Sequence, residues 1–312
     1  MTEFIHKPVL LDQCIEGLKI KPNGVYVDGT LGGGGHSAVI AQNLDADGLL
    51  VGIDRDGDAI AAGGERLSAL DKPFVLVRNN YEQIKQVLHD LSIQEVDGFL
   101  LDLGVSSYQL DTPERGFSYR YDAPLDMRMD DRADITAYDV VNSYSEKALA
   151  KIIKEYGEER YAKGIARALY RNRPVETTLQ LAQIIADTVP WRTPSQGHPA
   201  ARTFQAIRIA VNGELTGLAN TIVDMIDLLK PGGRICIITF HSLEDRIVKQ
   251  TFKHWANPCQ CPRDIPYCVC GKKPMVSLVT RKPIKSDALE LAENPRAHSA
   301  KLRIAERLGV QT

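Results

Sequence analysis

The stretch VYVDGTLGGGGHS, residues 25–37, decides the fold. It joins a short apolar run to four consecutive glycines and then to a segment typical of a helix start. Glycine lets a bulky group lie against the main chain, and a loop at this position presents backbone N–H groups and a helix N-terminus to a ligand. A flexible surface turn is the alternative, but it explains four glycines at a strand-to-helix junction less well. We therefore predict a ligand-binding strand–loop–helix unit.

Apolar runs alternate with amphipathic segments on the C-terminal side of this loop. We predict strands within residues 48–56, 73–80 and 96–104, with helices over 57–70 and 81–91. Strands that are apolar on both faces, alternating with such helices, indicate a parallel sheet that is covered on both sides. Right-handed crossovers then give a doubly wound α/β sheet, with any ligand at the C-terminal ends of its strands.

The alternation stops after residue 104. The next residues are typical of a loop, the following stretch to about residue 189 is helical throughout, and a strand returns only at 231–242. We predict a Rossmann-like sheet interrupted by an inserted all-helical domain. The predicted division is a first part of the core at 1–108, a loop region with the helical domain at 109–204, and a second part of the core at 205–312.

Composition and charge exclude several classes of protein. The 312 residues are 44% hydrophobic and 25% charged, which is ordinary for a globular protein. No apolar run approaches the roughly 18 residues that cross a bilayer, and the N-terminus has no features of a secretion signal. We therefore expect a cytoplasmic protein without a membrane partner. The net charge of −2 does not by itself indicate a nucleic-acid-binding protein.

Three predicted strands end in an acidic residue: Asp28, Asp54 and Asp102. A carboxylate at Asp54 can accept both ribose hydroxyls of an adenine nucleoside, which suits NAD and S-adenosylmethionine equally. The G-x-G-x-x-G spacing of dinucleotide sites is met only by shifting its register. The three acids also suit a sulfonium and an amino group but would repel a pyrophosphate. These features favour a methyl donor over NAD.

Four blocks of the sequence together resemble one family. They are HKPVLLDQ with DGTLGGGGHS, then DLGVSSYQLDTPERGFSYRYDAPLDMRMD, then RTFQAIRIAVNGEL, and finally GGRICIITFHSLEDRIVK with the cysteines after it. The chain resembles the bacterial 16S rRNA cytosine-N4 methyltransferases, the RsmH/MraW family, from Lys7 to Cys270. The resemblance implies a class I methyltransferase fold, S-adenosyl-L-methionine as cofactor, and the exocyclic N4 of a decoding-centre (P-site) cytidine in the small ribosomal subunit as the methylated atom.

The resemblance also implies site residues. The positions that match the family's cofactor site are Gly34, Gly35, His36, Asp54, Tyr81, Asp102 and Gln109, with Asp54 on the ribose and Tyr81 against the adenine. The group that activates the amine is not identified, and Asp102 and His241 are the candidates. His241 has a second interpretation, because HSLED is also a capping-box pattern at a helix start.

Basic residues gather in two places. Arg160, Lys163, Arg167 and Arg171 recur at helical spacing, with no acid from Arg160 to Arg173, and Lys272 and Lys273 lie in a basic C-terminal segment. A solvated helix face is the usual explanation of such a stripe, but here we favour contacts with an rRNA backbone. The loop aromatics Phe117, Tyr119 and Tyr121, with Arg128, could clamp a flipped base or simply build the loop.

Four cysteines lie within twelve residues: Cys259, Cys261, Cys268 and Cys270. C-x-C is tight spacing for two ligands of one zinc ion, so we expect a basic loop without a metal, with zinc as the alternative. An apolar helix face in the second half is compatible with a homodimer and equally with a buried core. A nicotinamide-dependent oxidoreductase and a non-enzymatic RNA-binding assembly factor are the rival functions.

Overall fold

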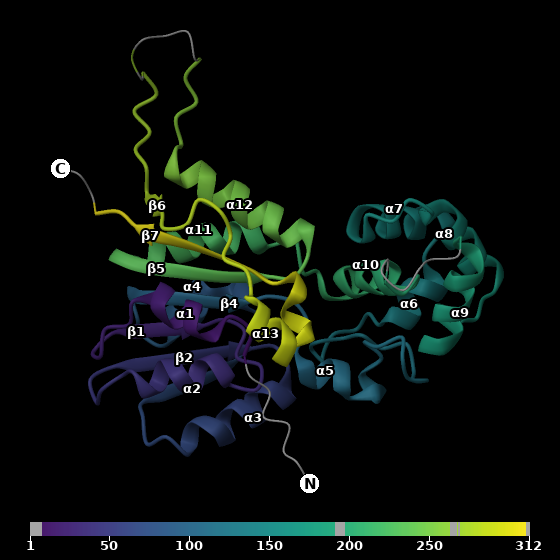
Figure 1. Cartoon of the computed structure of the whole chain (residues 1–312), viewed down its shortest axis with the longest axis horizontal. Helices are drawn as coiled ribbons and strands as arrows, with labels where there is room; N and C mark the ends of the chain where they lie inside the picture. The colour runs from purple at the N-terminus through teal and green to yellow at the C-terminus, as the bar shows by residue number, and fades with distance from the viewer. Residues whose placement is uncertain (1–7, 191–196, 263–266, 268, 310–312) are drawn as a thin grey trace. The chain divides into compact units, whose positions relative to one another are not determined.

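The computed structural model describes residues 8–190, 197–262, 267 and 269–309 (Figure 1). Its contacts divide the chain into two compact units. The first, called the sheet unit here, combines Met1–Gly104 with Thr216–Thr312, and the second, the helical unit, is Val105–Leu215. Each unit is described by itself below.

The sheet unit is built on seven strands in the order β3-β2-β1-β4-β5-β7-β6. Neighbouring strands from β3 to β5 are parallel, whereas β7 is antiparallel to both β5 and β6. The strands are β1 (Val25–Asp28), β2 (Leu49–Asp54), β3 (Phe74–Arg78), β4 (Val96–Asp102), β5 (Leu229–Thr239), β6 (Val276–Leu278) and β7 (Lys301–Arg307). The predicted α/β sheet is confirmed.

Helices cover both faces of this sheet because its strands carry apolar residues on both sides (Figure 1). On one face Val27, Phe99 and Ile237 pack in a core cluster with α4, α11 and α12; on the other, Tyr26 and Leu100 pack with α1, α2 and α3. The helices are α1 (Leu11–Leu18), α2 (Gly35–Gln42), α3 (Gly57–Ser68), η1 (Tyr81–Gln83), α4 (Ile84–Asp90), α11 (Leu218–Leu228), α12 (Ser242–Ala256), α13 (Ala288–Glu293) and η4 (Pro295–Ser299).

The chain crosses from one half of the sheet to the other between β1 and β4. From β1 it continues outward through β2 to β3, and it then returns to β4 on the opposite side of β1. In such sheets ligands bind at this reversal, beyond the carboxyl ends of the strands. Asp28, Asp54 and Asp102 are the last residues of β1, β2 and β4, so the topology brings all three predicted acids to this edge.

The sequence did not predict β6 and β7. β7 carries four charged residues in seven, yet Arg303 is only 7% exposed. Its guanidinium donates to the Asp245 carboxylate of α12 at 2.7 Å, which replaces the hydration that burial removes. A strand with such charges does not show the apolar pattern that identified β1 to β5.

The helical unit lies in the chain between β4 and α11. Its elements are α5 (Ser107–Asp111), η2 (Pro113–Arg115), α6 (Ala137–Ser143), α7 (Glu146–Gly157), α8 (Ala162–Arg171), α9 (Thr178–Thr188) and α10 (Ala201–Asn212). Leu149, Ile165, Ile185 and Phe204, from four different helices, meet in its core. Packing therefore assigns α10 to this unit, although the predicted division placed residues 205–312 in the sheet core. The separate folding of this unit as an inserted domain stays a prediction.

Within the described residues, no helix has both the length and the apolar composition needed to cross a membrane.

Candidate active site

In the glycine loop, two glycines pack closely against neighbouring residues and a third borders open space. A Cβ on Gly35 would lie 2.4 Å from Cγ of Pro8, and Gly34 has φ of 72° and approaches Cα of Gly63. By contrast, a Cβ on Gly33 would meet nothing within 4 Å. Gly34 and Gly35 thus satisfy the packing around α2, whereas the main chain at Gly33 faces a space that a ligand could enter.

Asp28, the last residue of β1, anchors this loop. It is 1% exposed, and the Ser37 hydroxyl donates to it at 2.7 Å, as does the Thr30 N–H at 3.1 Å. Burial is the largest influence on its carboxyl and raises the pKa to about 6, against the opposing effect of these hydrogen bonds. Asp28 therefore fixes the end of β1 to the first turn of α2, which is a structural task.

Asp54 holds the loop from the side of β2. One carboxylate oxygen accepts from the Gly32 N–H at 2.9 Å, and the other accepts from the Asp56 N–H at 2.9 Å. Burial raises the pKa of this carboxyl above its usual value. Each oxygen still has a second lone pair, so Asp54 can hold the loop and accept ribose hydroxyls at once.

Asp102 ends β4, which lies beside β1 on the side opposite to β2. Its N–H donates to Oγ1 of Thr30 at 2.6 Å, and its Oδ2 lies 3.7 Å from Nδ1 of His36. Its Oδ1 is inaccessible to solvent and has no hydrogen-bond partner among the described residues. Burial first, and then the charges of Asp28 and Glu244, raise the pKa of Asp102 to about 8. A carboxyl in this state can hold or accept a proton near neutral pH, which is typical of functional sites.

His36 is oriented by its other ring nitrogen. Nε2 lies 3.0 Å from the Val9 carbonyl, which can only accept, so Nε2 carries the proton. Nδ1 then faces Asp102 at a distance too long for a direct hydrogen bond. His36 and Asp102 were predicted to lie in one site, and the structure brings their side chains together.

Two further predicted cofactor residues have structural partners of their own. Tyr81, at the start of η1, is 7% exposed and belongs to the core cluster beneath the sheet. Gln109 lies in the helical unit, where its Oε1 accepts from the Ser106 N–H at 3.0 Å in a capping box at the start of α5. Their contact with a cofactor stays a prediction.

His241 is the N-cap of α12, so the capping interpretation is confirmed. Its Nδ1 accepts from the Glu244 N–H at 3.4 Å, and Glu244 accepts in turn from the Phe240 N–H at 2.9 Å. Nε2 lies 3.1 Å from Oε1 of Glu244 without the geometry of a hydrogen bond. His241 therefore serves the helix start, and a second role beside the target base stays a prediction.

The predicted RNA-binding residues are exposed in both units. Lys163, Arg167 and Arg171 are exposed on α8, and Arg160 is exposed just before that helix. Lys272 and Lys273 follow α12 in the sheet unit. One sequence argument needs correction, since Glu146 of α7 lies 3.5 Å from Nε of Arg167. The stripe has a compensating acid, which comes from a neighbouring helix rather than from its own.

Most of the residues proposed to clamp a base have partners within the protein instead. Phe117 is 6% exposed in the core of the helical unit, and the guanidinium of Arg128 donates to both oxygens of Asp126. Tyr119 stacks on His198 with ring centroids 4.3 Å apart. Tyr121, at 47% exposed, is the member of this set whose ring is available to solvent.

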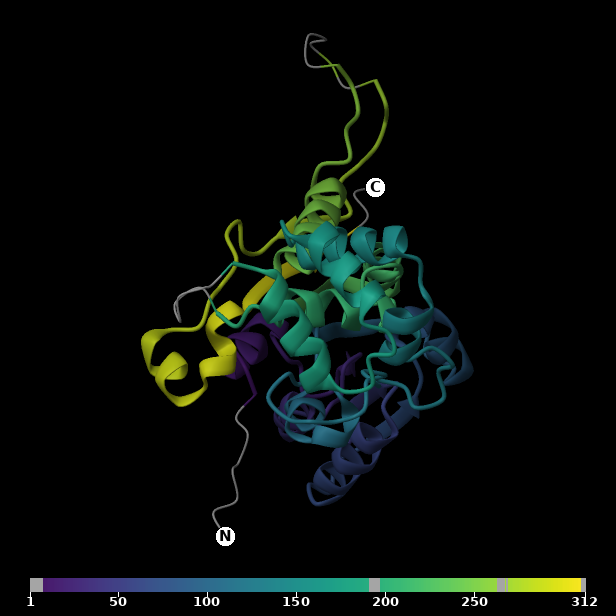
Figure 2. The same ribbon diagram turned by 90° about the vertical axis from the view of Figure 1, so that its right-hand side faces the viewer.

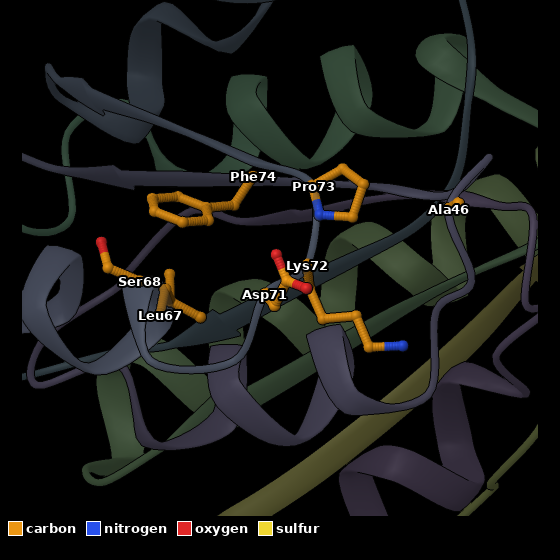
Figure 3. Close-up of a pocket in the computed structure, with 7 residues that line it drawn as sticks. All are labelled: Ala46, Leu67, Ser68, Asp71, Lys72, Pro73 and Phe74. Atoms are coloured by element: carbon orange, nitrogen blue, oxygen red, sulfur yellow. The ribbon is translucent and has the colours of Figure 1, made fainter.

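A surface pocket of about 670 Å³ lies elsewhere, at the turn between α3 and β3 (Figure 3). It is lined by Ala46, Leu67, Ser68, Asp71, Lys72, Pro73 and Phe74. Phe74 begins β3, so this pocket is at the amino ends of the strands. Asp28, Asp54 and Asp102 are at the opposite, carboxyl ends. It plays no part in the site described above.

Sequence reasoning missed three contributors to the site. Thr30 receives the Asp102 N–H, Ser37 donates to Asp28, and Glu244 adds negative charge near Asp102. The DGT pattern gave a signal only for the turn at Asp28, since Asp side chains often accept from the backbone N–H two residues on, here that of Thr30. The effect of Glu244 depends on the pairing of β4 with β5, which no local pattern contains.

An acid-lined edge at the reversal of a doubly wound sheet, with a glycine loop opening onto it, defines a nucleoside-cofactor enzyme. Comparison with known proteins supplies the family. The sequence model of the MraW methylase family matches residues 3–308. The chain belongs to this family, and it is a methyltransferase that uses S-adenosylmethionine.

Curated relatives match along the whole chain. Ribosomal RNA small subunit methyltransferase H 2 of Agathobacter rectalis is 56% identical over 310 residues, covering 98% of this chain and 99% of that protein. The proteins named ribosomal RNA small subunit methyltransferase H of Lachnospira eligens and Ruminiclostridium cellulolyticum are 56% and 54% identical, each over 312 residues. The alignments cover 99% of this chain and 99% of the first, and 98% of this chain and 100% of the second.

Proposed function

We propose that this methyltransferase transfers the methyl group of S-adenosylmethionine to the exocyclic N4 of a P-site cytidine in 16S rRNA of the small ribosomal subunit. The names of its relatives and the blocks of sequence shared with their family support this substrate. Such a substrate implies work in the cytoplasm. A homodimer stays a prediction, to be tested by the mass of the protein in solution.

We propose the cofactor site at the carboxyl edge of β1, β2 and β4. Gly34, Gly35 and His36 would border the methionine end, Asp54 the ribose and Tyr81 the adenine, with Asp102 and Gln109 completing the site. The open space at Gly33 and the spare lone pairs of Asp54 support this assignment. The proposed RNA-binding residues are Arg160, Lys163, Arg167, Arg171, Lys272 and Lys273.

The observation that carries the mechanism is the carboxyl of Asp102, inaccessible at one oxygen and with a pKa raised to about 8. The cytosine amine is a weak nucleophile because its lone pair is conjugated with the ring. Bound S-adenosylmethionine would supply an electrophilic methyl group, and its sulfur would take the electrons of the carbon–sulfur bond as N4 displaces it. The amine must then release a proton, and an ionised Asp102 can accept the hydrogen bond and then that proton.

The direct experiment offers labelled S-adenosylmethionine and small ribosomal subunits from cells that lack this protein. The expected product is N4-methylated cytidine in nucleoside analysis. At saturating donor, Asp102→Asn should lower the single-turnover rate by about 10²–10⁴, the range for loss of a general base. With the native protein, this rate should rise as pH passes through the pKa of Asp102 and level off above it.

Two outcomes would overturn parts of the proposal. Donor binding without labelling of any subunit or rRNA would favour the rival function, an RNA-binding assembly factor. Labelling at the same rate in Asp102→Asn would exclude Asp102 as the proton acceptor and return His241 to consideration.

A further inference from the structure

The segment between α12 and β6 holds the cysteine-rich stretch of the sequence. The chain leaves α12 at Ala256 and returns to β6 at Val276 as two legs of a loop (Figure 1, Figure 2). The base of the loop is closed by the Met275 N–H, which donates to the Trp255 carbonyl at 2.9 Å. The methyl-transfer site uses none of these residues, so the cysteines need an explanation of their own.

Three cysteines of this loop converge. The Sγ atoms of Cys259, Cys261 and Cys270 all lie within 4.8 Å of one another. The distance between Sγ of Cys259 and Sγ of Cys270 is 3.9 Å. Two thiolates on one tetrahedral zinc ion, each with a Zn–S bond of about 2.3 Å, are about 3.8 Å apart. A disulfide needs about 2.05 Å, so the spacing matches shared coordination rather than a bond.

The surroundings of the sulfurs suit a metal–thiolate centre. The Val269 N–H donates to Sγ of Cys261 at 3.3 Å, as backbone amides do at thiolate ligands. Lys272 and Lys273 follow Cys270 by two and three positions in sequence. Three thiolates and one Zn²⁺ leave a charge of −1, and positive side chains nearby offset it.

The loop also has little hydrophobic core to hold it. Tyr267 and Val269 are each 79% exposed, the highest values among the large apolar residues that the structure describes. A segment that buries so little apolar surface cannot offset the entropy cost of ordering its backbone. Small elements of this kind are usually cross-linked by a disulfide or a metal ion.

We propose that Cys259, Cys261 and Cys270 bind one structural zinc ion that fixes the two legs of the loop. Each cysteine gives up its proton as its sulfur binds the metal. The C-x-C spacing argued against this in the sequence, but the Cys259 and Cys261 sulfurs lie in the same cluster. Cys268 lies outside the described residues, and the proposal does not use it.

The test measures metal in the full-length protein purified without chelators. Elemental analysis should find about one zinc per chain, and Cys259→Ser and Cys270→Ser should each lower the content at least tenfold. Replacement by Co²⁺ should give sulfur-to-cobalt charge-transfer absorption together with the visible bands of a tetrahedral ion. Tyr267→Ala is the matched control, since it changes the same loop without removing a sulfur, and it should keep both the zinc and the spectrum.

A second measurement guards against misfolded variants. In the native protein, alkylation of Cys259 and Cys270, mapped by mass spectrometry, should be slow with zinc and fast after a strong chelator. Native protein with less than about a tenth of an equivalent of zinc and no cobalt spectrum would overturn the proposal. So would a peptide map of protein purified under reducing conditions in which Cys259 and Cys270 are joined by a disulfide.

Discussion

In the glycine loop, two neighbouring residues differ in what their missing side chain allows. A Cβ on Gly33 would meet no atom within 4 Å, whereas a Cβ on Gly35 would lie 2.4 Å from the Pro8 ring. We therefore expect Gly33→Ala to leave the free energy of unfolding without cofactor within about 0.5 kcal/mol of the native value. The same change should weaken S-adenosylmethionine binding at least tenfold, because the methyl occupies the space proposed for the ligand. Denaturant unfolding and isothermal calorimetry measure the two quantities.

Gly35→Ala is the contrasting variant. Its methyl overlaps a packed proline, so the free energy of unfolding should fall by about 1–3 kcal/mol. A Gly33→Ala protein that binds the donor as tightly as the native protein would show that the cofactor does not approach the loop at this residue.

Asp102 makes a prediction about stability and pH. The pKa of its carboxyl in the folded protein is raised to about 8, above an unfolded value of about 3.9. Between these values the folded state binds the extra proton, so this carboxyl makes stability fall as pH rises through that window. Asp102→Asn removes the effect. The difference in melting temperature, variant minus native, should therefore grow from pH 6.5 to pH 8.5.

The pH range separates Asp102 from its neighbour. Asp28, whose pKa is raised to about 6, completes most of its titration below this range and is present in both proteins. A constant difference in melting temperature across the range would show that the carboxyl of Asp102 is already ionised at pH 6.5.

At the scale of elements, sequence patterns predicted the part of the sheet that is buried on both faces. Strands such as β4, with Phe99, Leu100 and Leu101 all fully buried, read as continuous apolar runs. The antiparallel edge was missed because its polar residues are satisfied by partners distant in sequence. Arg303 and Asp245 are 58 positions apart, and only the packing of α12 on β7 brings them together.

The pair of Arg303 and Asp245 should matter for the stability of this edge. The side chains of both are largely buried. Arg303→Ala therefore takes away the closest cation of a buried carboxylate and leaves it the Lys301 ammonium at 3.4 Å. We expect the free energy of unfolding to fall by about 3 kcal/mol, as for other broken buried pairs. The double variant Arg303→Met with Asp245→Leu should recover at least half of this loss in denaturant unfolding. If it recovers none, packing rather than charge explains the effect.

The basic stripe formed by Arg160 and three residues of α8 gives a graded prediction about RNA. Arg160, Lys163 and Arg171 are exposed, whereas Arg167 lies near the Glu146 carboxylate. Changing one of the first three to Ala should lower affinity for small-subunit rRNA and reduce the slope of log K against log salt by about 0.7. Arg167→Ala should change the slope less, because its charge is already partly compensated. If all four variants keep the slope of the native protein, the stripe does not contact phosphate.

At the scale of the whole molecule, the sequence predicted those parts of the site that the sheet topology alone brings together. Asp28, Asp54 and Asp102 meet because parallel strands end at one edge, and a local sequence pattern identifies each strand end. Tyr81 and Gln109 came only from the resemblance. Their side chains have core or capping partners in the structure, and no physical argument from the sequence gives them a ligand.

Hydrogen exchange on the whole protein tests which of these residues the cofactor reaches. Saturating S-adenosylhomocysteine should slow exchange in the peptides that cover residues 29–36, 54–56 and 102–104, since a ligand that binds only the folded state suppresses local opening around it. If Gln109 belongs to the site, α5 in the helical unit should gain protection in the same experiment, while α9 should not change. NAD at the same concentration is the control and should protect none of these segments, because the acids at the strand ends repel its pyrophosphate. Protection of the sheet unit without α5 would remove Gln109 from the cofactor site and leave it as the capping residue of α5.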